Sequence, residues 1–125
     1  AQGAWPIRSI RLVVPFAAGG AADSSARVLT PRMGETLGQG FVVENRTGAS
    51  GSLGGNEVAR ATDGHTFLWD ASSHIVNPAL LRGLPFDYAT AFAPISLVVQ
   101  FPSAIAVKND FPARTLAEFV AIAKQ

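Results

Sequence analysis

The chain has 125 residues, of which 48% are hydrophobic and only 15% are charged. This composition is too apolar for a disordered chain, and no apolar run reaches the roughly 20 residues that a membrane-spanning helix needs. Ten basic and nine acidic residues are spread along the sequence and give a net charge of +1, so no basic run is available to follow a phosphate backbone. Composition therefore indicates a folded domain and excludes nucleic acid as an expected partner.

The sequence contains no cysteine, which excludes disulfides and thiolate metal sites but leaves the redox compartment open. It begins with Ala1-Gln2-Gly3-Ala4, without a methionine, a basic leader or an apolar leader. We expect from this start that either a signal peptide has been removed from a secreted protein or the sequence simply begins at this point.

The first half of the chain alternates between strand and helix patterns. A β-branched run within 7–16 ends at Pro15 and predicts a buried strand. Apolar residues spaced by three and four then predict a helix over 21–37, which Gly38 stops and Pro31 kinks or interrupts. A second strand is expected at 41–44. A glycine- and serine-rich loop at 45–55 follows it.

The second half continues the alternation. The sequence predicts a helix over 54–61, a strand over 66–69, a polar loop over 72–77, a helical turn over 78–81, a turn and crossing segment over 83–88, and strands over 92–99 and 103–107. Thr115 with Glu118 three positions later forms a capping box, which opens a helix over 116–124. Such alternation predicts the α/β class, with a mainly parallel sheet flanked by helices on both faces.

The turn over 15–23 is the first candidate ligand site. It joins the carboxyl end of a strand to the start of a helix, where open α/β sheets bind ligands. The glycines Gly19 and Gly20 allow close backbone approach, and the free amides of the helix start suit a carboxylate or a phosphate. Because the two glycines are adjacent and no lysine follows, neither nucleotide-binding fingerprint fits. The alternative is that the glycines only turn the chain and Asp23 interacts with the amides of the first helical turn.

The loop over 70–77 is the second candidate, because it follows the third strand to the same edge of the sheet. It offers hydroxyls, an imidazole and an amide for hydrogen bonds to a polar ligand group. The alternative is a capped loop in which Ser73 or Asn77 bonds its own backbone. Ser73 beside His74 could also be read as a nucleophile and base, but no orienting acid is indicated. The two histidines, His65 and His74, are too far apart for a helical metal pair, so no metal is expected.

Four segments carry a resemblance to a known family: PIRSIRLVVPFAAGGAADSSAR (6–27), LGQGFVVENRTGASGSLGGNEVARA (37–61), DGHTFLWDASSHIVNPAL (63–80) and FDYATAFAPISLVV (86–99). In this order they resemble the receptor proteins of tripartite tricarboxylate transporters, also called the Bug family. The resemblance implies a two-domain, clamshell-like periplasmic binding protein without a cofactor. It further implies a receptor, not an enzyme, that captures a small carboxylate for the membrane subunits of the transporter.

The resemblance also implies which residues bind the ligand. It assigns to the first loop Phe16, Ala18, Gly19, Gly20, Ala21, Ala22 and Asp23, and to the second loop Ser72, Ser73, His74 and Asn77. One departure is Ala18, where family members typically carry a proline in the turn. Anion capture is expected from the backbone amides of 19–22, partly through ordered water.

A second departure is length, since family members are usually more than twice as long. We expect residues 1–100 to be the first part of ligand-binding domain 1, and 101–125 to be the crossover and the start of domain 2. A chain this short would leave apolar faces uncovered, which predicts a homodimer or an exchange of elements between copies. Two alternatives to a receptor stay open: a small α/β hydrolase that uses Ser73 and His74, and an interaction or assembly fragment without a ligand.

Overall fold

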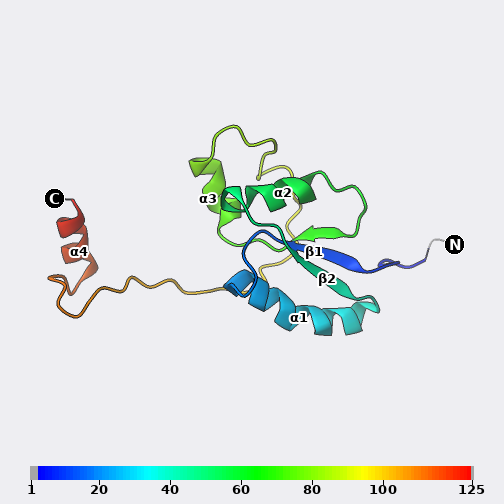
Figure 1. The fold of residues 1–125 in the computed structure, drawn as a ribbon, viewed down its shortest axis with the longest axis horizontal. Coiled ribbons are helices and arrows are strands. Elements are labelled where there is room, and N and C mark those ends of the chain that lie inside the picture. Colours follow the sequence, from blue (N-terminus) through cyan, green and yellow to red (C-terminus); the bar gives the residue numbers. More distant parts are fainter. Residues whose placement is uncertain (1–2, 125) are drawn as a thin grey trace.

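The computed structural model describes residues 3–124, which form a small sheet with helices on both faces, followed by an extended arm (Figure 1). The sheet has three strands in the order β2-β1-β3. β1 (Ile10–Val14) lies in the middle and pairs in parallel with β2 (Phe41–Asn45) and with β3 (Thr66–Leu68). This architecture confirms the predicted α/β class with a parallel sheet.

Strand β1 is buried on both of its faces, as its uninterrupted apolar sequence predicts. Leu12 and Val14 form one core cluster with Ala26 of the helix that follows. Val13, on the opposite face, is fully buried. Arg11, on the same face as Val13, forms ion pairs with Glu44 of β2 and with Glu57 of a later helix.

Helix α1 (Ala21–Leu37) covers one face of the sheet and contacts β1 and β2. It ends at Gly38, whose left-handed backbone (φ 71°) suits glycine. Pro31 lies inside this helix, which runs through it as one unbroken element. The interruption that proline suggested is therefore not found.

Helices α2 (Ser52–Ala59) and α3 (Ser73–Leu80) lie on the opposite side of the sheet from α1 (Figure 1). A short 3-10 helix (Ala49–Gly51) precedes α2, so the predicted loop over 45–55 is shorter than expected. The predicted polar loop over 72–77 was wrong, because those residues form most of α3. Its polar residues Ser73 and Asn77 are buried. A prediction that assigns polar segments to loops cannot detect a helix whose polar side chains are buried.

After Phe92 the chain leaves the sheet as an extended arm that ends in α4 (Leu116–Ala123) (Figure 1). The capping box of α4 is confirmed, with the Thr115 hydroxyl and the Glu118 carboxylate bonding each other's backbone amides. The predicted strands over 92–99 and 103–107 were wrong: neither segment is a strand in the part of the chain described. Extended backbone becomes a strand only when a neighbour satisfies its hydrogen bonds, and within residues 3–124 no strand pairs with the arm.

The described residues include no helix that is both long enough and apolar enough to cross a lipid bilayer. The boundary expected at residue 100 between two ligand-binding domains stays a prediction. The arm exposes large apolar side chains to solvent, with exposed fractions of 79% at Ile95 and 81% at Leu97.

Candidate functional site

The order of the strands places one crevice at the carboxyl edge of the sheet. From β1 the chain passes through α1 to β2 on one side, whereas β3 lies on the other side of β1. Helix α1, which follows β1, and helix α3, which follows β3, therefore lie on opposite faces of the sheet (Figure 1). In open α/β sheets this reversal point is where ligands bind, and both predicted loops, 15–23 and 70–77, begin at it.

The glycine turn has a defined backbone hydrogen-bond pattern. The Gly20 amide donates to the Ala17 carbonyl oxygen at 3.2 Å, and the Gly19 amide donates to Asp23 Oδ2 at 2.8 Å. Gly19 has a φ of 80°, a conformation that side-chain-bearing residues rarely adopt. Both glycine amides are thus engaged within the turn and are not available to a ligand.

The backbone amides of the first turn of α1 are not engaged in this way. Among residues 3–124, no hydrogen-bond partner is found for the backbone amides of Ala21, Ala22 and Asp23, and no side chain caps the helix at Gly20. These donors lie at the positive end of the dipole of a helix of 17 residues. Of the 19–22 amides that the sequence suggested, only those of Ala21 and Ala22 are therefore unengaged, and the Asp23 amide joins them.

Asp23 does not point to solvent, because its side chain is only 3% exposed. Its Oδ1 accepts hydrogen bonds from Arg27 Nε and Asn45 Nδ2, each at 2.9 Å, while Oδ2 accepts from Gly19. The Arg27 bond, the Gly19 amide and the Asn45 amide together hold the pKa of Asp23 at about 2. The carboxylate is charged and saturated with donors at neutral pH.

The other first-loop residues differ in exposure. Phe16 is half-buried and packs against the core, while Ala18 lies exposed in the turn. The Phe16 carbonyl accepts a hydrogen bond from Asn45 Nδ2 at 3.0 Å, which ties the turn to the end of β2. Trp69, at the end of β3, donates from Nε1 to Ser25 Oγ of α1 at 3.1 Å and so ties the neighbouring loop to the same helix.

The second-loop residues divide into buried and accessible groups. Asn77 is 1% exposed and donates to the Ser50 carbonyl oxygen at 2.8 Å and to the Tyr88 hydroxyl at 3.0 Å. Ser73, also buried, donates its hydroxyl proton to Asp70 Oδ1. Ser72, at the start of α3, is exposed. Of the predicted hydroxyls, only the one on Ser72 faces solvent.

His74 turns toward an aromatic cluster, with its ring centroid 5.3 Å from that of Tyr88 and 5.5 Å from that of Phe92. Its Nδ1 lies 3.7 Å from Asp70 Oδ2, a buried oxygen without a hydrogen-bond partner in the described part of the chain. Burial also raises the pKa of the Tyr88 hydroxyl. The predicted residues Ser73, His74 and Asn77 thus hold α3 in place.

This arrangement does not support the hydrolase alternative. Ser73 Oγ bonds Asp70 and not His74, and it is almost completely buried, so no nucleophile and base are paired there. Within residues 3–124, no group of three or more metal-binding side chains is gathered.

Sequence reasoning missed the residues that hold these loops from behind. Asn45, at the last position of β2, was included in a loop, although it bonds Phe16, Asp23 and Arg27. Tyr88 was assigned to a crossing segment, although it is 2% exposed and bonded to Asn77. A polar residue directly after an apolar strand was the available signal for Asn45; nothing in the sequence marked Tyr88.

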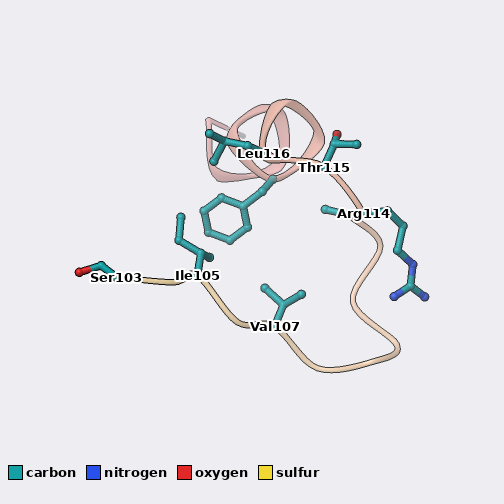
Figure 2. Close-up of a pocket in the computed structure, with 8 residues that line it drawn as sticks. Ser103, Ile105, Val107, Arg114, Thr115 and Leu116 are labelled. Carbon is teal, nitrogen blue, oxygen red and sulfur yellow. The ribbon is translucent and has the colours of Figure 1, made fainter. Parts of the chain in front are cut away.

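A hollow of about 400 Å³ lies elsewhere, between the arm and the start of α4 (Figure 2). Ile105 and Val107 point into it from the arm, opposite Leu116 of the helix (Figure 2). A ligand site usually combines an apolar lining with a few convergent polar groups. This hollow lacks such convergence, because Arg114 points away from it (Figure 2).

Comparison with known proteins gives the context of this geometry. A model of the tripartite tricarboxylate transporter family receptor matches residues 25–125. The chain belongs to this receptor family. The resemblance that the sequence motifs suggested is thereby confirmed.

Relatives align along nearly the whole chain. The sequence is 38% identical to a UPF0065 protein of Bordetella bronchiseptica over 96% of this chain and 36% of that protein. It is 34% identical to protein BugT of Bordetella pertussis, over 96% of this chain and 38% of BugT. The chain therefore spans less than two fifths of the length of these relatives.

Solved structures also match nearly the whole chain. MatC of Rhodopseudomonas palustris, determined with bound malate, matches 96% of this chain and 42% of its own length, with 35% identity and a TM-score of 0.79. Rpa4515 of R. palustris, determined with adipate, matches 96% of this chain and 41% of its own, with 34% identity and a TM-score of 0.78. These matches confirm the binding-protein fold, incomplete relative to its relatives.

Replacing Asn77 by alanine tests the buried network. The variant leaves the Ser50 carbonyl and the Tyr88 hydroxyl without a donor, so we expect a loss of about 1–3 kcal/mol of unfolding free energy. The midpoint of urea denaturation measures this loss of stability. Asn109→Ala, at an exposed position, is the control and should change stability by less than about 0.5 kcal/mol. Equal midpoints for the two variants would show that the network does not stabilise the fold.

Proposed function

We propose that this chain is the ligand-binding part of a periplasmic solute-binding receptor, which captures a small organic carboxylate for the membrane subunits of a tripartite tricarboxylate transporter. Membership of the receptor family supports the proposal, and two structural relatives were determined with malate and with adipate. The observation that carries it in this chain is the row of unpartnered amides at the start of α1, at the reversal point of the sheet. The protein acts as a receptor and not as an enzyme.

The ligand carboxylate accepts hydrogen bonds from the amides of Ala21, Ala22 and Asp23, and Gly19 and Gly20 shape the turn that leads to them. No basic side chain is needed, because two or three amides at a helix start bind an anion through their partial charges. Ser72 supplies a hydroxyl from the neighbouring loop. Phe16, Ala18, Ser73, His74 and Asn77 support these two loops.

Residues 1–100 belong to the first ligand-binding domain in this proposal, and 101–125 cross to a second domain. The arm passes near the start of α1 as it leaves the sheet (Figure 1), which supports this division. Closure of two such domains around a ligand is a hinge motion. The affinity of this chain alone then comes from one domain.

A thermal-shift screen tests the proposal with malate, adipate and other small carboxylates, with amino acids and nucleotides as comparison. A ligand at a hundred times its dissociation constant stabilises the folded chain by about 2.7 kcal/mol, which raises the melting temperature measurably. We expect a selective rise with one class of carboxylate. Gly20→Pro should abolish it, because proline cannot donate the bond to Ala17 and so opens the turn.

Gly64→Ala is the matched control, since Gly64 is a turn glycine with a φ of 64° that precedes β3 at the amino edge of the sheet. This variant should lower the melting temperature but keep the response to carboxylates. Absence of any carboxylate response in the unmodified chain would refute the proposed function for this chain.

The assembly alternative is favoured by one observation, the apolar side chains that the arm exposes. Ile95 and Leu97 are exposed to about four fifths of their area, at 79% and 81%. Light scattering should therefore report a mass that rises from monomer toward dimer with concentration, and Leu97→Glu should reduce the rise. Val42→Glu, at a half-exposed position of β2, is the control. A constant monomer mass would exclude both the homodimer and the exchange of elements.

A further inference from the structure

We propose that Asp23 is a positioning residue of the carboxylate site: it fixes the glycine turn from behind and does not contact the ligand with its side chain. The inference rests on the proposed function for its ligand, but its structural part concerns the turn alone. It reassigns the only acidic residue that the sequence placed in the first loop.

The bonding of the carboxylate excludes direct contact with an anion. Oδ1 accepts from Arg27 Nε and Asn45 Nδ2, and Oδ2 accepts from the Gly19 amide at 2.8 Å and from Arg27 Nε at 3.1 Å. With 3% of the side chain exposed, no oxygen is free to meet a ligand group. A ligand carboxylate brought against it would also be repelled by its charge.

The same bonds determine the shape of the turn. Holding the Gly19 amide inward keeps Gly19 at a φ of 80°, and the amides of Ala21 and Ala22 at the helix start have no partner among residues 3–124. Asn45 bonds both Asp23 and the Phe16 carbonyl, so the turn is fixed to the end of β2. The turn is therefore arranged before a ligand arrives, which lowers the entropy cost of binding.

Arg27 has a separate effect. It lies one helical turn after Asp23 and pairs with the carboxylate, but its side chain is 52% exposed, so solvent screens much of the charge that its removal would leave. The roles of Asp23 and Arg27 can therefore be distinguished by mutation, because of these two residues only Asp23 bonds the Gly19 amide.

The test compares Asp23→Asn with Arg27→Gln. An asparagine keeps the size of the side chain but places an NH2 group where one oxygen accepted, so the Gly19 bond and the Arg27 and Asn45 bonds cannot all form. We expect Asp23→Asn to weaken malate or adipate binding by at least about tenfold, measured by calorimetry well below the melting temperature. Arg27→Gln should lower stability but weaken binding less than about threefold, because the Gly19 bond remains.

The amide signal of Gly19 in nitrogen-proton NMR spectra reports directly on its bond to Asp23. It should move upfield and exchange faster in Asp23→Asn, and stay in place in Arg27→Gln. If Asp23→Asn does not fold, the unmodified chain still decides the question through a scalar coupling across the hydrogen bond from the Gly19 nitrogen to the Asp23 carboxylate carbon.

Three outcomes would overturn the inference: full affinity in Asp23→Asn, equal losses of affinity in both variants, or absence of the scalar coupling. If the unmodified chain binds no carboxylate, the proposed function fails by itself. The Gly19 signal then decides alone whether Asp23 positions the turn.

Discussion

The pairing of β1 with strands on both of its edges is the constraint on which the rest of this structure depends. The strands β2 and β3 satisfy its backbone on either side, and helices α1 and α2 contact it, so its carboxyl end has a fixed position. The turn after it must then start at the centre of the sheet edge. Every feature of the candidate site follows from that placement, including the start of α1 and the neighbouring loop after β3.

Polar side chains, more than apolar ones, hold the loops at this edge. Asp23 and Asn45 bind the turn after β1 to the end of β2, and Asn77 binds α3 to the turn before α2. Buried polar groups are stable only when their hydrogen bonds are complete, so each network accepts few geometries. This is a physical reason why three of the residues that the resemblance assigned to the ligand, Asp23, Ser73 and Asn77, are buried and bonded inside the protein.

The sequence predicted the elements whose signals are local. The apolar run of β1, the spacing in α1 with Gly38 after it, and the capping box of Thr115 and Glu118 each act within a few residues, and all three are confirmed. The predictions that failed depend on distant partners. Residues 73–77 are helical, with Ser73 and Asn77 bonded to buried partners, and the arm forms no strand because no other strand in the described part of the chain pairs with it.

The position of the candidate site at the sheet edge could likewise be predicted from the order of strand, turn and helix. Which backbone amides of the turn are free could not be predicted. That the Gly19 amide is engaged by Asp23 follows from a side-chain rotamer and from Asn45, which is 22 residues away. The family resemblance pointed to two loops that the structure brings to the same edge of the sheet, but it could not separate accessible residues from those that hold the loops.

The most direct test of this account is a titration of the isotope-labelled chain with malate, followed through every backbone amide signal. The account predicts saturable shifts at Ala21, Ala22 and Asp23, smaller ones at Ser72, and none at Gly64 on the opposite edge of the sheet. Shifts confined to the hollow between Ile105 and Leu116, or no saturable shift at all, would contradict it.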